Sequence, residues 1–352
     1  MAIDEQSPAS VTEREPARPQ RGGRWWAGAR GLLLGRPETG ALFGAIAMFI
    51  VFAFIAPSSE VFISRTALAG MASITAELAI VSMAITLLMI AGHFDLSVGS
   101  VLGFTSFLVP YLMLNHGFPG WLAVVVALAM AMSIGLVNGV LVVTTRIPSF
   151  IVTLGTLLIW RGVLFGLSGG TQLEVPQDNA VFDFFSHRVQ TGPFRGYQVS
   201  VLWFLAVAVV LSFLLLRTRF GNWTFACGGN ERSARSMGVP VDRVWLVLFV
   251  VTAGAAALTG LIQVGRFGVV EATRGTGLEL QAIAAAVIGG ARLTGGYGSV
   301  VGAALGAAMI AMIQQGLVLS GLASYWLNVF IGSLIIGAVI VNQVLGRSRP
   351  QV

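Results

Sequence analysis

Apolar runs separated by short polar breaks fill the chain from residue 41 onward. They cover residues 41–56, 67–91, 98–114, 120–143, 149–167, 199–216, 244–264, 279–291, 299–315 and 325–344. A helix needs about 20 apolar residues to cross the hydrocarbon core of a bilayer, and the first and eighth runs are the ones that fall clearly short. The pattern predicts an all-α integral membrane protein with about ten transmembrane helices, in one domain over residues 40–345.

The composition supports a membrane-embedded chain. Of its 352 residues, 56% are hydrophobic and 10% are charged, with a mean hydropathy of +0.84. A soluble domain is about 25% charged, so we expect the lipid bilayer as the surroundings of this apolar surface. All 21 basic residues are Arg, and the net charge is +6. We attribute this basic excess to membrane sidedness and expect no nucleic-acid partner.

The arginine positions orient the predicted helices. Cytoplasmic segments of membrane proteins carry an excess of basic residues. Ten spans place both termini on one side, and with that side inside, few arginines fall in the predicted outer loops: Arg65, Arg188, Arg195, Arg266 and Arg274. We therefore expect cytoplasmic tails at residues 1–39 and 346–352. In the longest outer loop, residues 168–199, two apolar Phe-containing pairs predict a segment that folds over the outer surface.

The polar break between the sixth and seventh runs reads RTRFGNWTFACGGNERSARSMGVPVDR and predicts a short, well-bounded helix. Asn230 is a good N-cap, because its side-chain oxygen can accept a hydrogen bond from an orphan backbone N–H. Glu231 and Arg235 place charges that complement the helix dipole at its two ends. Gly238 suits the left-handed position after the helix, and Pro240 prevents continuation. This helix either joins two spans or docks a partner.

A second break, GHFDLSVGS at residues 92–100, leaves almost no room for a loop between two apolar runs. Glycines at both ends suit a broken helix, and Ser97 and Ser100 can satisfy the backbone groups that the break frees. Irregular backbone at membrane depth is tolerated where it is buried in protein or lines a water-filled cavity. Asp95 either caps the following helix at the cytoplasmic surface or lines a solute pathway.

Four sequence blocks occur in a fixed order along the chain. They are R-T-R-x-G with G-G-N-E-x-x-A-R-x-x-G-V in the central break, FDLSVGSV at 94–101, PSFIVTLGTLLIWRG at 148–162 and ELQAIAAAVIGGARLTGGYGSVVG at 279–302. With these four blocks, the chain resembles the permease subunits of bacterial ABC sugar importers over roughly residues 65 to 343. The resemblance is to the ribose/xylose-type branch of the branched-chain amino acid/ribose permease family. Family members often carry Gly or Glu where His93 stands, so we assign His93 no special role.

The resemblance implies a homodimer with a solute pathway between the two copies, cytoplasmic ATPase subunits, and a periplasmic binding protein that delivers the solute. The solute class it implies is a monosaccharide or related polyol. The short helix would be the coupling helix, with ATPase-docking residues Gly229, Asn230, Glu231, Ala234, Arg235 and Gly238. The chain itself is expected to bind no cofactor. Without a Lys it cannot form a GxxxxGK[ST] phosphate loop, so ATP would be used by the partner ATPase.

Candidate residues for the solute pathway are Glu77, Asp95, Ser97, Phe150 and Thr153. Glu77 is costly in lipid, so it is expected to face the protein interior or a partner. Phe150 can stack on the apolar face of a sugar, although an aromatic residue in a span more often serves packing. Arg161, in the fifth run, is expected to extend its charged end outward along its stem.

The sequence contains no catalytic constellation and no metal-ligand spacing, so it predicts a transport subunit and not an enzyme. The rival interpretation is a stand-alone secondary carrier driven by an ion gradient. Such a carrier would need no ATPase-docking helix and would usually show more paired charge within the membrane. The location predicted for either transporter is the bacterial cytoplasmic membrane.

Overall fold

The computed structural model describes residues 37–55, 59–175, 179–192, 195–323 and 325–347, so most of both predicted tails lies outside it. Most of the described residues are helical. The helices are α2 (Pro37–Ile50), the π-helical turn η1 (Val51–Ile55), α3 (Ser59–Phe62), α4 (Arg65–Ile90), α5 (Val98–His116), α6 (Gly120–Thr145), α7 (Ser149–Ser168), α8 (Ala180–Phe185), α9 (Ser200–Arg217), α10 (Arg219–Gly229), α11 (Glu231–Ser236), α12 (Val241–Phe267), α13 (Leu278–Ile288), α14 (Val300–Leu319) and α15 (Trp326–Arg347).

The predicted membrane-spanning runs are all helices. Within the described residues, 7 helices are long and apolar enough to cross a bilayer, namely α4, α5, α6, α7, α9, α12 and α14. Shorter apolar helices, in α2, α13 and α15, account for the remaining runs. The prediction of an all-α membrane protein is confirmed, and the helix boundaries lie within a few residues of the predicted ones.

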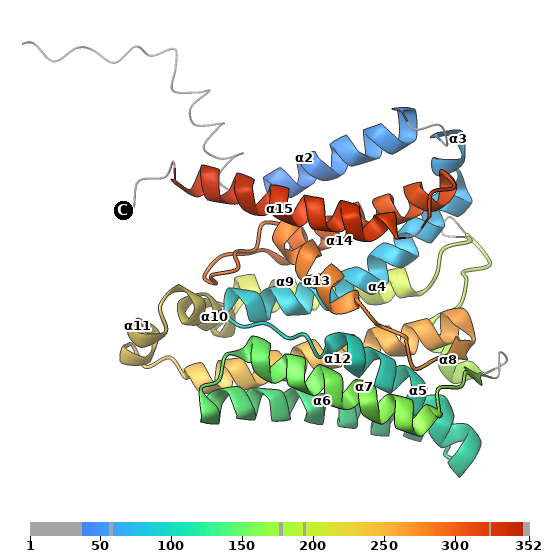
Figure 1. Ribbon diagram of the computed structural model, residues 1–352, viewed down its shortest axis with the longest axis horizontal. Coiled ribbons are helices and arrows are strands. Elements are labelled where there is room, and N and C mark those ends of the chain that lie inside the picture. The colour runs from blue at the N-terminus through green and yellow to red at the C-terminus, as the bar shows by residue number, and fades with distance from the viewer. Residues whose placement is uncertain (1–36, 56–58, 176–178, 193–194, 324, 348–352) are drawn as a thin grey trace, which may run out of the picture. The chain divides into compact units, whose positions relative to one another are not determined.

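The long helices lie side by side and roughly parallel, with α10 and α11 at one end and α3 and α8 at the other (Figure 1). Helix α4 is the most enclosed, because 89% of its apolar window is buried, compared with 17% for α7 and for α9. Lipid tails are as apolar as leucine side chains, so the exposed sides of α7 and α9 suit a bilayer or a second copy. The polar positions discussed below lie on the enclosed helices.

The chain is irregular in the middle of the bundle at two places. Residues 91–97 run from the α11 end inward to the start of α5, and residues 268–277 run from the opposite end inward to the start of α13 (Figure 1). The starts of α5 and α13 meet there: a Cβ on Gly99 would lie 2.5 Å from the carbonyl oxygen of Gly275. Only glycine permits this approach, so both breaks are part of the packed core.

The long loop after α7 is folded. Strand β1 (Leu173–Glu174) pairs antiparallel with β2 (Val269–Val270), directly after α12. In α8, three apolar residues are buried: Val181, Phe182 and Phe185. Phe184 instead packs its ring edge-on against Trp121 and Trp203, with ring centroids 5.3 and 5.4 Å apart. The apolar pairs of this loop therefore form a small cap over one end of the bundle.

Candidate functional site

Helix α11 forms where the sequence places it. The side-chain oxygen of Asn230 accepts a hydrogen bond from the backbone N–H of Ser233 at 3.0 Å, which caps the first turn. Gly238 follows the helix with φ of 79°, the left-handed conformation that glycine adopts without strain. A helix of six residues is not stable alone, so α11 depends on contacts with the rest of the chain.

The preceding helix, α10, was not predicted. Two adjacent glycines, Gly228 and Gly229, are a pattern typical of a helix break, whereas α10 continues through both. The reason is steric: a Cβ on Gly228 would overlap the carbonyl oxygen of Ile90 and lie 2.6 Å from the backbone nitrogen of Gly296. Gly228 is thus required by close packing of α10 against the end of α4 and not by a turn.

The exposed face of α11 differs from the predicted one. Ala234 has 4% of its surface exposed and is buried in this chain, so it does not present itself to a partner. The exposed residues of this segment include Arg232, Ser233, Ser236 and Met237, and Met237 is 83% exposed. Gly229, Asn230 and Gly238 are also exposed, while Glu231 and Arg235 are half-buried. Any docking surface on α11 is centred on these exposed positions.

Four charged residues, which we call the Arg235 cluster, hold α11 against its neighbours: Arg146, Glu231, Arg235 and Asp242. Arg235 forms a two-pronged ion pair with Asp242 at 2.6 and 3.0 Å and bonds Glu231 at 3.0 Å. Arg146, at the end of α6, lies 3.5 Å from both carboxylates. Networked, two-pronged pairs are stronger than isolated surface pairs, so α11, α6 and α12 are tied together here.

Trp245 connects this cluster to the broken segment between α4 and α5. The guanidinium carbons of Arg146 and Arg235 lie 5.8 and 5.6 Å from the centre of the Trp245 ring, within cation–π range. Trp245 also meets the His93 ring edge-on, with centroids 4.2 Å apart. A continuous chain of side chains thus runs from α11 to residue 93.

Sequence reasoning missed Trp245, and it gave His93 no role. One signal could have flagged Trp245: it lies three residues after Asp242 on α12, which places both on the same face of that helix. The pairing of His93 with Trp245 carries no local signal, because the two residues are far apart in the chain. The spatial link depends on the packing of α12 beside the broken segment.

A second group, the Asp95 network, is fully buried: Asp95, Ser97, Asn138 and Thr252. One oxygen of Asp95 accepts hydrogen bonds from the backbone N–H and the hydroxyl of Ser97, at 2.9 and 2.6 Å. The other accepts from the Thr252 hydroxyl on α12 at 2.8 Å. The Asn138 amide on α6 donates to the Ser97 hydroxyl at 2.9 Å. Asp95 therefore joins the break to α12, and Ser97 joins it to α6. Asp95 binds Ser97 instead of capping the first turn of α5.

The broken segment is also fastened to α7. The backbone N–H of Phe94 donates to the Ser149 hydroxyl at 3.0 Å, and the Ser100 hydroxyl donates to the carbonyl of Leu157 at 2.8 Å. On α7 itself, Thr153 is buried and bonds the Ser149 carbonyl at 2.8 Å. Phe150 is 52% exposed. The two predicted pathway residues on α7 therefore differ: Thr153 is buried within the chain, whereas Phe150 is open to its surroundings.

Glu77 lies apart from the Asp95 network, on another part of α4. Its carboxylate accepts a hydrogen bond from Arg266 at 2.6 Å and from Gln263 at 3.1 Å, both on α12. The expectation of an interior partner for this carboxylate fits the geometry. The structure brings Asp95 and Ser97 together, but it does not place Glu77 or Phe150 with them.

Arg161 turns inward, contrary to the expected outward extension. Its guanidinium donates to the carbonyls of Ala272 and Arg274 at 2.8 and 2.7 Å. These carbonyls belong to the irregular segment before α13, which lacks helical partners for them. Backbone groups at membrane depth need internal partners, so Arg161 supports this segment. Glu279, near the start of α13, accepts a hydrogen bond from the Gly277 N–H at 3.1 Å.

Comparisons with known proteins agree with this architecture. Residues 67–339 match the family model described as "Branched-chain amino acid transport system / permease component". The chain is 34% identical over 306 residues to the autoinducer 2 import system permease protein LsrC of Salmonella typhi, covering 86% of this chain and 85% of that protein. It is 34% identical over 315 residues to LsrC of Escherichia coli strain K12 / DH10B, covering 89% and 87%.

Proposed function

The chain belongs to the branched-chain amino acid transport system permease component family, and we propose that it is the membrane-spanning permease subunit of an ATP-driven ABC importer. The observation that carries this proposal is α11, a short capped helix with an exposed face. The charged cluster behind α11 leads through Trp245 to a break in the core. A helix that only joins two spans would need no such connection.

We propose that the ATP-hydrolysing subunit is a separate chain that docks on the exposed face of α11. This chain would bind no nucleotide in a phosphate loop, since it has no Lys to form one. We also propose that it binds no other cofactor. Closure of the ATPase would move α11, and the Arg235 cluster and Trp245 would pass that movement to residues 91–97. The Asp95 network would then rearrange with the helices that it joins.

The proposed assembly is a homodimer in the bacterial cytoplasmic membrane, with both termini in the cytoplasm. The exposed sides of α7 and α9 supply surface for the bilayer and for a second copy. Under this orientation α11 faces the cytoplasm and α8 faces the periplasm. A periplasmic binding protein would deliver the solute at the α8 end.

We propose a small polar solute: a monosaccharide, a related polyol, or autoinducer 2, for whose import the relatives are named. An ion-coupled carrier is the second candidate, because two carboxylates among the described residues are buried in the core, Glu77 and Asp95. Both are engaged, however. Glu77 pairs with Arg266, and Asp95 accepts three hydrogen bonds. Neither presents the unengaged carboxylate that an exchanging ion would need, which favours the importer.

The proposal is tested by purifying the tagged chain from native membranes and identifying what comes with it. We expect an ATPase chain with a Walker motif to co-purify. ATP hydrolysis by that complex should rise when binding protein and solute are added. Recovery of the chain with no ATPase, together with solute uptake driven by an imposed ion gradient, would favour the carrier instead.

A further inference from the structure

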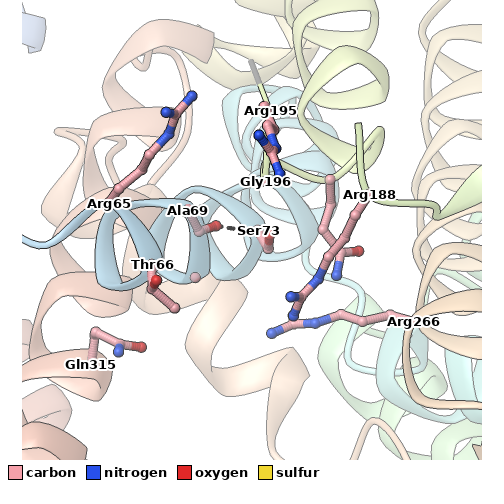
Figure 2. A pocket seen from close by; sticks show the side chains of 11 residues that line it. Arg65, Thr66, Ala69, Ser73, Arg188, Arg195, Gly196, Arg266 and Gln315 are labelled. Carbon is pink, nitrogen blue, oxygen red and sulfur yellow. Dashed lines mark hydrogen bonds between the residues drawn. The ribbon is translucent and has the colours of Figure 1, made fainter. Parts of the chain in front are cut away.

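The end of the molecule opposite α11 contains a cavity of about 490 Å³. Its walls come from the first turns of α4, the segment after α8, the last turn of α12 and the second half of α14. It is lined by Arg65, Thr66, Ala69, Gly70, Ser73, Arg188, Arg195, Gly196, Gln198, Arg266 and Gln315. Figure 2 shows that the guanidinium groups of Arg188 and Arg266 point toward the same part of this cavity. Small-molecule sites have volumes of about 300–1,000 Å³, so the cavity has the size of a ligand site.

The lining is strongly positive. The described residues that line it include four arginines and no carboxylate. Among the residues that the structure describes, no ion pair is formed by Arg188 or Arg195, and both are exposed. Several positively charged arginines around one cavity repel one another, and together they raise the local concentration of anions. Gln198, Gln315 and Thr66 add neutral hydrogen-bonding groups to the same walls.

Arg266 contacts both the buried Glu77 and the cavity. One of its terminal nitrogens, Nη1, pairs with the buried Glu77 at 2.6 Å, and the same residue lines the cavity. A guanidinium has five N–H donors in a planar fork, so this pair leaves donors for a ligand. Glu77 therefore partly offsets the positive charge that Arg266 offers a ligand. The positive charges of Arg188 and Arg195 are not offset in this way.

We propose that this cavity binds a phosphate group, carried either by a small soluble phosphate or by the headgroup of an anionic phospholipid. A phosphate monoester bears a charge of about −1.5 to −2 at pH 7 and three strong acceptor oxygens. Arginine forks match phosphate geometry and hold it through paired hydrogen bonds. Two unpaired arginines and one partly offset arginine balance such a charge better than they balance a single carboxylate.

The test measures the thermal unfolding midpoint of the full chain in phosphatidylcholine nanodiscs. The probes are inorganic phosphate and glycerol 3-phosphate, compared with chloride at equal ionic strength. We expect a saturable rise in Tm with either phosphate. In a parallel arm, nanodiscs that contain phosphatidylglycerol replace the soluble probes. A rise in the first arm identifies a soluble phosphate, and a rise in the second arm alone identifies a lipid headgroup.

Variants make the test specific. Arg188→Gln with Arg195→Gln removes two charge-assisted partners, so we expect the apparent Kd to weaken about tenfold or more. Arg217→Gln with Arg219→Gln is the matched control, since it removes two exposed arginines near the α11 end, and binding should not change. Glu77→Gln should tighten binding, because it releases the charge of Arg266. A merely structural role for these arginines would not produce that opposite sign.

The proposal fails if phosphate and chloride act alike at equal ionic strength in both arms. It also fails if the Arg188 and Arg195 variants retain the full Tm rise. If the double variant does not fold, Arg195→Gln alone serves, since this residue is exposed; an unchanged Kd there contradicts the proposal. A rise in Tm with an added acidic protein, but with neither phosphate source, would contradict the proposal and assign the cavity to protein docking.

Discussion

The hydrogen-bond partners of Asp95 can be foreseen from the sequence only in part. A carboxylate in a Gly-bounded break is visible in the sequence, and so is its neighbour Ser97. Its other partners are not, because Thr252 lies 157 residues away, and Asn138 lies 41 residues from Ser97. Ala234 shows a different limit of the sequence. The resemblance implied that Ala234 docks a partner, whereas its side chain is buried within this chain, and nothing in the local sequence distinguishes the two kinds of contact.

We predict that Asp95→Ala abolishes solute uptake. Removing the carboxylate leaves the N–H and hydroxyl donors of Ser97 without their acceptor in the core, whereas the Thr252 hydroxyl can still donate to the carbonyl of Phe249 at 2.9 Å. Each unsatisfied buried group costs about 1–3 kcal/mol. We expect a lower Tm and little uptake in reconstituted vesicles, with Asp95→Asn intermediate because it keeps an acceptor oxygen. Asp183→Ala, at an exposed position of α8, is the control. Uptake by Asp95→Ala at the normal rate would show that the network has no role in transport.

Among the elements, α11 was predictable and the segment before α13 was not. The start and stop signals of α11 act within one or two helical turns, and they are Asn230, Gly238 and Pro240. The sequence alone therefore placed both ends of α11. Residues 268–277 read as an ordinary outer loop. Their inward course depends on Arg161, which is 111 residues from the carbonyl of Ala272 that it holds. Helix α10 was missed because glycine signals both turns and close packing, and the sequence cannot separate the two.

The exposed face of α11 indicates which substitution would weaken docking of the ATPase. Met237 is 83% exposed, and an exposed large apolar residue on a docking helix would be buried on assembly. We predict that Met237→Asp lowers ATPase co-purification and stimulated hydrolysis without lowering permease yield. Leu322→Asp, at an exposed apolar position after α14, should change neither. Ala234→Arg should lower the yield itself, because that side chain is buried. Full co-purification with Met237→Asp would argue that α11 is only a connector.

The link from α11 to the break predicts a variant that separates hydrolysis from transport. His93→Ala removes the ring contact with Trp245 and leaves the Arg235 cluster intact. Aromatic pairs contribute about 0.5–1.5 kcal/mol, so we expect uptake per ATP hydrolysed to fall up to about tenfold, with ATPase binding unchanged. The control is His116→Ala, which removes a comparable ring pair with Tyr111. Equal coupling ratios in the two variants would remove His93 from the transmission route.

At the scale of the whole molecule, the number and position of the apolar helices followed from the sequence, because hydropathy acts locally along the chain. Their sidedness is predicted from the positions of the arginines along the chain. The relative placement of the two breaks was beyond the sequence. Contact between the starts of α5 and α13 depends on Gly99 and Gly275, which are far apart in the chain.

We predict that α11 faces the cytoplasm and α8 faces the periplasm. Cys227 is a poor reporter, because burial raises the pKa of its thiol to about 11 and keeps it protonated at neutral pH. In a Cys227→Ala background, Met237→Cys should react with an impermeant maleimide only after the inner membrane is opened. Asp183→Cys, in α8, should react in cells with only the outer membrane permeabilised. Reaction of Met237→Cys from the periplasm would reverse the orientation and exclude α11 as an ATPase-docking helix.

The central claim is that this chain moves solute with energy from ATP hydrolysed by another subunit. The direct measurement is uptake of labelled solute into proteoliposomes that contain the chain, the co-purified ATPase and the binding protein. We predict that uptake requires ATP inside the proteoliposome on the α11 side and persists when ionophores collapse every ion gradient. Uptake by the chain alone, driven by an imposed ion gradient and abolished by ionophores, would contradict the account.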